Sequence, residues 1–304
     1  MHISGHGSDQ ISPAPTIVPA SVAALQTAPP PTDNKIQAAS LAGTSFKKGV
    51  TYSTKVASGE CKTPAQIQTD VAFLVSQGHD LIRLYGTECG GPKNLQAAVK
   101  DTGVWMFLGI FDISQAAAGA SDIATQLGKD WSQVHTVAIG NEVVQNGGDP
   151  GAVVAAIGTA RSALRGLGYN GPVVTVDTAI KVEVHPELCQ KSDYCAVNCH
   201  AFWDGNAPDK AAKTIDFHVQ ALKEKTGMNK VIITESGWPT CGSSEGASTA
   251  SPEAQSAAIA SLKSVSSADV ILFSAFNELW KADFGGSKGG EKCWGIYGNA
   301  RGGL

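Results

Sequence analysis

Short apolar runs alternate with helix-like segments from residue 45 to the end of the chain. Eight of these runs are nearly continuous in β-branched and aromatic residues, which is typical of strands buried on both faces of a parallel sheet. The eight runs cover residues 47–52, 81–85, 104–110, 134–141, 172–177, 194–202, 230–235 and 270–278. Eight strands that alternate with helices over about 250 residues are typical of a (β/α)8 barrel. We therefore predict an α/β fold with a single TIM barrel.

Helix signals fill the segments between the runs. Thr63 and Pro64 form an N-cap and a first-turn proline, the apolar residues that follow recur at helical spacing, and Gly78 ends the pattern. Residues 150–168 carry apolar side chains at the same spacing, and residues 251–265 open with another Ser-Pro pair. These segments therefore predict helices that connect the strands.

A doubly wound open sheet is the alternative to the barrel. It requires a glycine-rich phosphate loop after the first strand, and residues 49–60 (GVTYSTKVASGE) do not contain G-x-G-x-x-G. After the eighth run only the glycine-rich residues 279–304 remain. We therefore expect the closing helix of the barrel to be short or missing.

Proline, serine, threonine and alanine dominate residues 1–44, and no periodic apolar face begins before Phe46. Such a composition is typical of a flexible or polyproline-like segment. We predict a disordered or extended N-terminal arm over residues 1–44, which acts as a linker or stalk. The catalytic domain is predicted over residues 45–304.

The charge of the chain argues against a nucleic-acid partner. Charged residues make up 16% of the sequence, the net charge is −4 and the pI is about 6.0, so no basic patch is expected. The sequence also lacks a run of about 18 apolar residues, the length that spans a bilayer. We expect no nucleic acid partner, no membrane insertion and a monomer.

Seven cysteines are present, and none of them forms a C-x-x-C motif. Cys195 and Cys199 have no histidine at zinc-finger spacing, so we expect no metal and no cofactor. Three disulfides with one cysteine left over would fit an oxidising compartment. The chain opens without a signal peptide, so secretion is inferred from the cysteines and the low charge.

In a barrel of this kind, functional residues lie at the carboxyl ends of the strands. Those ends are rich in carboxylates and aromatic rings, and they lack the His/Asp/Glu cluster of a metal hydrolase. They carry Tyr52, Arg83, Tyr85, Asp112, Asn141, Glu142, Asp177, His200, Phe202, Trp203, Glu235 and Glu278.

Two of these carboxylates, Glu142 and Glu235, follow the fourth and the seventh predicted strands. The two strands are three apart around a ring of eight, so the carboxylates could face each other across the barrel mouth. Glycoside cleavage needs two carboxyl groups that flank the scissile bond. Asn141, beside Glu142, could bind the sugar 2-hydroxyl, although an amide at a strand end is also an ordinary turn residue.

Aromatic residues gather at the same ends and could stack on sugar rings. Any one of them could equally belong to the core, but seven at one mouth favour a carbohydrate site. They are Tyr52, Tyr85, Phe202, Trp203, Trp238, Trp280 and Trp294.

Six motifs spread over residues 46–298 resemble those of glycoside hydrolase family 17, the β-1,3-glucanase family. They are IRLYGTEC (82–89), VAIGNEV (137–143), VNCHAFWD (197–204), VIITESGWPT (231–240), FNELWK (276–281) and EKCWGIY (291–297). Within the family, the chain is most similar to fungal cell-wall glucanases and glucanosyltransferases. The segment NCHAFW departs from the expected pattern by its cysteine before the histidine and by Trp203, which affects the expected detail of the subsites.

The resemblance implies a retaining mechanism with Glu142 as acid/base and Glu235 as nucleophile. It implies that Glu278 and Lys281 orient the site and contact sugar hydroxyls. It also implies a cleft lined by Tyr52, Arg83, Tyr85, Asn141, His200, Phe202, Trp203 and Trp294.

We therefore expect an endo-β-1,3-glucanase type of enzyme that acts on fungal cell-wall glucan through a covalent glycosyl-enzyme, in the extracellular space or cell wall. A β-1,3-glucanosyltransferase would use the same residues with a glucan acceptor, and the sequence leaves hydrolysis and transfer, and endo and exo action, open. A non-catalytic wall-binding protein would have lost a carboxylate, and a phosphate-binding aldolase would need a reactive lysine at a strand end.

Positions around the predicted barrel suggest the disulfides. Cys61 and Cys89 belong to neighbouring mouth loops, and so do Cys241 and Cys293, so we expect Cys61–Cys89 and Cys241–Cys293. If His200 points inward, Cys195 and Cys199 point outward by strand alternation. We expect Cys189–Cys195 with Cys199 as a buried thiol; a Cys189–Cys199 bond or three free thiols are the alternatives.

Overall fold

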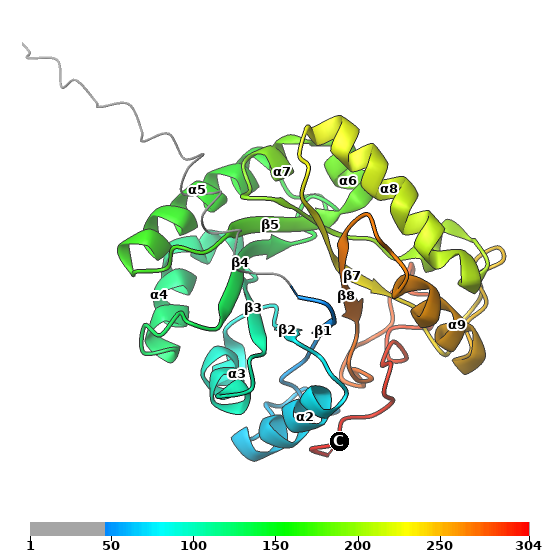
Figure 1. Ribbon diagram of the computed structural model, residues 1–304, viewed down its shortest axis with the longest axis horizontal. Coiled ribbons are helices and arrows are strands. Elements are labelled where there is room, and N and C mark those ends of the chain that lie inside the picture. Colours follow the sequence, from blue (N-terminus) through cyan, green and yellow to red (C-terminus); the bar gives the residue numbers. More distant parts are fainter. Residues whose placement is uncertain (1–45, 304) are drawn as a thin grey trace, which may run out of the picture.

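The computed structural model of the protein describes residues 46–303, and these form a closed parallel barrel whose strands pair in chain order (Figure 1). Strand β1 pairs with both β2 and β8, which closes the ring. The strands are β1 Gly49–Thr51, β2 Leu81–Arg83, β3 Trp105–Ile110, β4 Val134–Asn141, β5 Val173–Thr178, β6 Cys195–Asn198, β7 Val231–Gly237 and β8 Asp269–Phe273. The predicted (β/α)8 fold and all eight strands are confirmed, although β6 and β8 end earlier than predicted.

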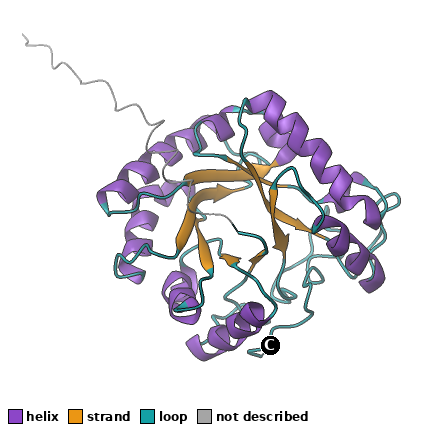
Figure 2. Ribbon diagram, viewed as in Figure 1, coloured by secondary structure: helices purple, strands orange, loops and turns teal. Residues whose placement is uncertain are grey.

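Helices surround the strands as an outer ring (Figure 2). They are α2 Pro64–Ser76, α3 Gly91–Val99, α4 Ala116–Gln126, α5 Pro150–Gly166, α6 Ala179–Val184, α7 Glu187–Gln190, α8 Ala211–Thr226 and α9 Pro252–Leu262. Short 3-10 turns precede some of them: η1 Glu88–Gly90, η2 Ile113–Gln115, η3 Ala201–Asp204 and η4 Pro208–Lys210. The N-cap predicted at Thr63 is present, with a capping box to Gln66 and Pro64 in the first turn.

Two apolar cores hold the barrel together. The inner core fills the barrel below the mouth, and its members include Phe46, Leu81, Phe107, Ala138, Val174, Val176, Tyr194, Ala196, Ile232 and Ile271. The outer core lies between the strands and the helices and is much larger. Because side chains fill the interior of the barrel, a ligand can reach only its ends.

The chain after β8 contains no helix within the described residues, as the glycine-rich composition of residues 279–304 predicts. The C-terminal segment instead runs back past α2 (Figure 1). The backbone N–H of Gly302 donates to Asp70 Oδ1 on α2. Asp70 is buried and also accepts from Lys62 Nζ at 2.8 Å and from the Tyr52 hydroxyl at 2.9 Å. A buried polar cluster therefore anchors the tail where a closing helix would pack.

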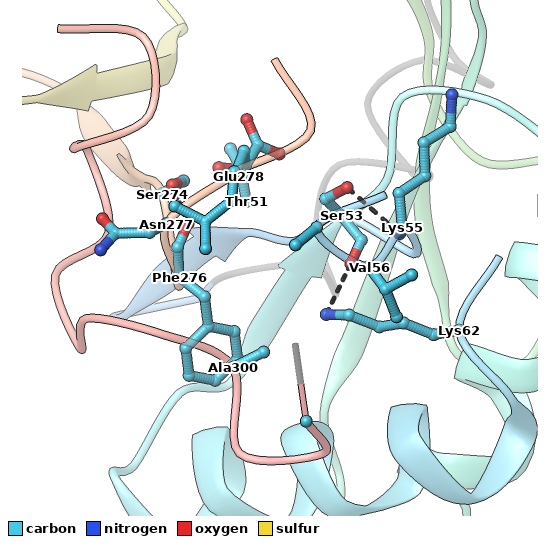
Figure 3. Close-up of a pocket in the computed structure, with 13 residues that line it drawn as sticks. Thr51, Ser53, Lys55, Val56, Lys62, Ser274, Phe276, Asn277, Glu278 and Ala300 are labelled. Carbon is cyan, nitrogen blue, oxygen red and sulfur yellow. Dashed lines mark hydrogen bonds between the residues drawn. The ribbon is translucent and has the colours of Figure 1, made fainter. Parts of the chain in front are cut away.

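A small cavity of about 20 Å³ separates this tail from β1 (Figure 3). Ala300 and Phe276 form part of its wall, and Lys62 Nζ donates to the Ser53 carbonyl beside it at 3.1 Å. Ser53, Lys55 and Glu278 belong both to this cavity and to the large cavity described below. The tail therefore supports one wall of the barrel mouth from behind.

The structure contains the disulfides Cys61–Cys89, Cys189–Cys195 and Cys241–Cys293, the same pairs that the sequence analysis expects. Cys199 is a buried free thiol, and burial raises its pKa. The predicted arm over residues 1–44 lies outside the described residues. Within residues 46–303, the helices are too short or too polar to cross a membrane.

Candidate active site

A cavity of about 980 Å³ opens at the carboxyl ends of the strands. Residues that follow β1 to β6 and β8 contribute to its wall, from Tyr52 after β1 to Trp294 after β8, and β7 contributes Glu235 itself. This is the end of the barrel at which the strand-end residues of the sequence analysis gather. The volume is at the upper end of the range of ligand sites, about 300–1,000 Å³, and leaves room for an extended ligand.

Glu235 lies on β7, is 5% exposed and lines the cavity. Arg83 Nη1 donates to its Oε1 at 3.1 Å, and His200 Nε2 lies 3.2 Å from its Oε2. Burial by itself would raise the pKa of this carboxyl. The hydrogen bond from His200 and the charge of Arg83 outweigh burial and lower the pKa of Glu235, so this carboxylate is ionised.

Glu142 follows β4 directly and lines the same cavity. Burial raises its pKa, and the charge of Glu235 raises it further. The hydrogen bond from Asn198 Nδ2 to Glu142 Oε1, at 2.8 Å, opposes this shift without cancelling it. Glu142 therefore holds a proton at pH values at which Glu235 is charged.

The backbone turns sharply where β4 reaches the mouth. Glu142 has φ 55°, in the left-handed region, and Gly140 has φ 75°. A Cβ on Gly140 would lie 2.9 Å from side-chain atoms of Ile113 and Val143, so only glycine fits there. Asp177 on β5 accepts from the N–H groups of Val144 and Gln145 and holds the turn in place. The predicted strand-end residue Asp177 thus supports the loop that carries Glu142.

Asn198, at the end of β6, joins the two glutamates through hydrogen bonds. Its Nδ2 donates to Glu142 and, at 3.1 Å, to Asn141 Oδ1. Its Oδ1 accepts from Arg83 Nη1 at 3.2 Å and from Thr234. Because Arg83 Nη1 also contacts Glu235, one arginine and one asparagine connect the neighbourhoods of both carboxyl groups.

The sequence analysis did not select Asn198, because the predicted sixth strand continued to residue 202 and its end was read from His200 onward. The strand ends at Asn198. Strand alternation with His200 would have been the signal, since residues two apart on a strand share a face.

Glu278 and Lys281 lie in the loop after β8 and line the cavity. Lys281 Nζ forms an ion pair with Glu278 and lies 4.0 Å from Glu291. Burial would lower the pKa of Lys281, but the charge and hydrogen bond of Glu278 and the charges of Glu235 and Glu291 together outweigh burial and raise it. Lys281 is therefore a charged hydrogen-bond donor at the cavity wall.

Aromatic rings form much of the remaining wall. Trp203 and Trp280 line the cavity, and Trp294 packs its ring 5.0 Å from the His200 ring. Phe111 and Phe284 also line it and are 59% and 65% exposed. The sequence analysis selected neither phenylalanine: Phe284 lies beyond the eighth predicted strand, and at the end of the third predicted strand Asp112 was selected instead of Phe111. Exposed aromatic rings around a cavity are suited to stacking on the apolar faces of sugars.

Three of the predicted cleft residues are placed differently from the prediction. Arg83 does not line the cavity: it is 2% exposed and contacts the cavity residues Glu235 and Asn141 through hydrogen bonds. Phe202 does not line the cavity: it is 1% exposed and packs against Trp203, Trp238 and Trp294, because η3 turns its side chain behind the wall. Tyr52 contacts the cavity, but its hydroxyl points away to Asp70.

Four of the predicted site residues meet in one place. Arg83, Tyr85, Asn141 and His200 all contact Glu142, Glu235 or one of their partners. Burial raises the pKa of the Tyr85 phenol, and the charge of Glu235 adds to this shift. Asp112 instead caps η2 by accepting from the Ser114 N–H, and it does not line the cavity. Among residues 46–303, no group of three histidine, cysteine or acidic side chains is placed to hold a metal.

A parallel eight-stranded barrel with one ionised and one protonated glutamate on an aromatic-walled cavity has the features of a glycosidase. The comparison with known families agrees with this class. The BtgE/BtgC glycoside hydrolase domain matches residues 49–295, and the chain belongs to this family.

Curated relatives support the same assignment. Cell surface mannoprotein MP65 of Candida albicans is 42% identical over 262 residues, which cover 84% of this chain and 68% of that protein. Probable family 17 glucosidase SCW4 of Saccharomyces cerevisiae is 42% identical over 257 residues, which cover 83% of this chain and 65% of that protein. The resemblance to glycoside hydrolase family 17 is therefore confirmed. The chain spans about two thirds of the length of each relative.

Among solved structures, a family 17 β-1,3-glucanosyltransferase from Rhizomucor miehei has the same fold, with a TM-score of 0.70 and 23% identity. The match covers 85% of this chain and 97% of that one. A mutant of a β-1,3-glucanosyltransferase from the same organism, solved with laminaritriose, has a TM-score of 0.71 and 22% identity over 84% of this chain and 96% of that one.

Proposed function

We propose that this chain cleaves β-1,3-glucan with retention of configuration, with Glu235 as nucleophile and Glu142 as acid/base. The observation that carries the proposal is the opposite direction of the two pKa shifts on one cavity wall. A glycosidase requires one ionised carboxylate and one protonated carboxyl that donates to the leaving oxygen. The choice of retention, in which the ionised carboxylate attacks as nucleophile, rests on the membership of glycoside hydrolase family 17. The titles of the Rhizomucor structures, one with laminaritriose bound, support the choice of β-1,3-glucan.

The first step forms a glycosyl-enzyme. A carboxylate oxygen of Glu235 bonds to the anomeric carbon, the bond from that carbon to the glycosidic oxygen breaks, and the proton of Glu142 passes to the leaving oxygen. Arg83 and His200 hold Glu235 in an ionised and fixed position before the attack. Asn141 uses its Oδ1 to accept from Arg83 and Asn198, which leaves its amide nitrogen as a donor for the sugar 2-hydroxyl.

The second step reverses the roles. Esterification removes the negative charge of Glu235, and this charge is one of the causes that raise the pKa of Glu142. The pKa of Glu142 therefore falls, and its carboxylate can take a proton from the incoming hydroxyl as the ester bond breaks. Water as acceptor gives hydrolysis. Glu278 and Lys281, in the loop after β8 and near Glu235, contact sugar hydroxyls.

Transfer to a second glucan is the other candidate. It is favoured by the Rhizomucor neighbours, which are glucanosyltransferases, and by a cavity that extends well beyond the two glutamates. A place outside the cell, at the wall, fits the three disulfides and the cell-surface relative.

Laminarihexaose tests both reactions. Wild-type protein should form shorter products by hydrolysis, and products longer than the substrate if it transfers, as measured by mass spectrometry. Glu235→Ala should lower turnover by at least about a thousandfold, and Glu142→Ala should retain activity mainly on donors with an aryl leaving group, which need little acid help. The matched control Glu224→Gln, on the exposed face of α8, should behave as wild type. Wild-type rates in both alanine variants would refute the assignment.

A further inference from the structure

A histidine outside the catalytic cluster lies between two carboxylates at one end of the cavity. His218 Nδ1 is 3.2 Å from Glu183 Oε1 on α6, and His218 Nε2 is 3.2 Å from Asp204 Oδ1 at the end of η3. His218 and Asp204 both line the cavity. We call these three residues the His218 clamp. None of them takes part in the mechanism described above.

The geometry of the clamp requires a charged imidazolium. Each ring nitrogen faces a carboxylate oxygen, and only the protonated ring donates from both nitrogens. The hydrogen bond to Asp204 raises the pKa of His218, and the bond to Glu183 adds to the effect, while burial opposes it. The side chain of His218 is 10% exposed, and those of Glu183 and Asp204 are 26% and 30% exposed. The clamp is thus a pair of partly buried, charge-assisted hydrogen bonds.

The clamp fixes one end of a very short segment of the cavity wall. Residues 200–204 begin with His200, which contacts the nucleophile Glu235, and end with Asp204, which contacts His218. Trp203 lies between them, lines the cavity and is 38% exposed. The position of the Trp203 ring therefore depends on contacts at both ends of the segment.

The same clamp connects this segment to α6, because Glu183 lies on that helix. Thr178 and Ile180, at the start of α6, also line the cavity, and Ile180 is 61% exposed. His218 thus joins two parts of the wall, η3 and α6. These parts follow strands β5 and β6, which lie opposite β1 and β2 in the ring of eight.

The chemistry assigns this side to the acceptor. Arg83, Glu278 and Lys281 surround Glu235 from β2 and from the loop after β8, so the sugar that becomes attached to Glu235 lies toward them. Glu142 protonates the leaving oxygen, and the leaving group therefore extends past β4 toward β5 and β6. By microscopic reversibility, the acceptor binds where the leaving group departed.

We propose that His218, held between Glu183 and Asp204, is a positioning residue that fixes the acceptor end of the cavity for a glucan acceptor. The proposal rests on the proposed function. The clamp holds Trp203 and the start of α6 at a set separation, which pre-organises the acceptor site and lowers the entropy that binding costs. His218 acts through these neighbours and does not touch the reacting atoms.

The test compares His218→Phe with wild type, using an aryl β-laminaribioside as donor and laminaritriose as acceptor. In His218→Phe, the acceptor concentration that gives half-maximal transfer should rise about fivefold, after correction for any change in the rate of donor consumption without acceptor. A fivefold change corresponds to part of the free energy of one charge-assisted hydrogen bond. His185→Phe is the matched control, because His185 pairs with Glu187 and does not line the cavity. Equal changes in donor consumption and acceptor dependence, or equal effects in the two variants, would overturn the proposal.

A second arm guards against misfolding and against failure of the proposed function. Asp204→Ala should reproduce the effect. The double variant Asp204→Ala/His218→Phe should add little to it, because both substitutions remove the same contact between His218 and Asp204. Hydrogen bonds from Ala247 N–H to Gly205 and from Asn206 to Thr214 should keep the loop folded.

If wild type does not turn over the donor, the proposed function fails. The His218 clamp is then tested by calorimetry, which measures the Kd of laminarihexaose for the Glu235→Gln variant and for the double variant Glu235→Gln/His218→Phe. The Kd should be about fivefold higher for the double variant. An unchanged Kd would overturn the proposal for the clamp.

Discussion

At the scale of single residues, Asn198 shows how a neutral side chain sets the charges around it. Its amide nitrogen donates to Glu142 and its amide oxygen accepts from Arg83, so it supports the proposed acid and the partner of the proposed nucleophile together. Its bond to Glu142 lowers the pKa of that carboxyl, against burial and the charge of Glu235. Asn198 therefore limits how far the pKa of Glu142 rises.

Replacing Asn198 by alanine should shift the pH dependence of catalysis. The pKa of Glu142 should rise further, because a hydrogen bond to its charged form is lost. The descending limb of kcat/KM against pH, which reports the acid in the free enzyme, should move to higher pH. The rate at the optimum should fall about tenfold through the loss of orientation. Asn170→Ala, at an exposed loop, is the control. A descending limb that stays in place would show that Asn198 does not tune Glu142.

At the scale of elements, a tail and a buried ion pair lie beside α2, where the described residues after β8 form no helix. Lys62 and Asp70 are 5% and 0% exposed, and Asp70 accepts from Lys62, Tyr52 and the N–H of Gly302. These contacts join the loop after β1, helix α2 and the C-terminal segment. Because the same loop supplies Ser53 and Lys55 to the large cavity, the tail supports the mouth of the barrel.

Asp70→Ala should destabilise the protein by about 3–5 kcal/mol, because it leaves the Lys62 ammonium buried without its partner. Urea denaturation followed by circular dichroism measures the change. Asp209→Ala is the matched control, since Asp209 forms an exposed ion pair with Lys210, and it should leave the denaturation midpoint unchanged. If Asp70→Ala unfolds at the wild-type urea concentration, the cluster does not anchor the tail.

At the scale of the whole molecule, the barrel brings side chains from distant parts of the chain to one pole. Arg83 and Glu235 are 152 positions apart in sequence and lie in contact. This closure produces the low-dielectric wall in which one glutamate is ionised and the other protonated. It also predicts a bell-shaped dependence of activity on pH.

The ascending limb of that profile should follow ionisation of Glu235, and the descending limb should follow loss of the proton from Glu142. The enzyme should be active at pH values between the pKa of Glu235 and the pKa of Glu142. Because the pKa of Glu235 is lowered and that of Glu142 is raised, this pH range is wider than for two unperturbed carboxyl groups. Rates on an aryl laminarioside measured across pH check this. Glu142→Gln should abolish the descending limb, and a limb that persists would assign it to another group.

The fold was predictable from the sequence because its signals are local. Buried parallel strands need nearly continuous apolar runs, and Thr63 with Pro64 or Ser251 with Pro252 mark helix starts within a few residues. The family motifs, and the rule that functional residues of a barrel lie at the carboxyl ends of its strands, also selected Glu142 and Glu235 as a pair of candidate carboxylates. The order of strands around the barrel then follows from chain order.

The tertiary structure decided what depends on direction and environment. The end of β6 at Asn198 brought that residue to the glutamates, and the turn of η3 placed Phe202 behind the wall; neither is set by residue type. His218 lies on a helix, where no strand-end rule reaches it, and becomes visible only when α6 and η3 pack against α8. The sequence by itself determined the barrel and its pair of carboxyl groups. Their protonation, their partners and the shape of the cavity depend on distances between remote residues, which only the closed barrel sets.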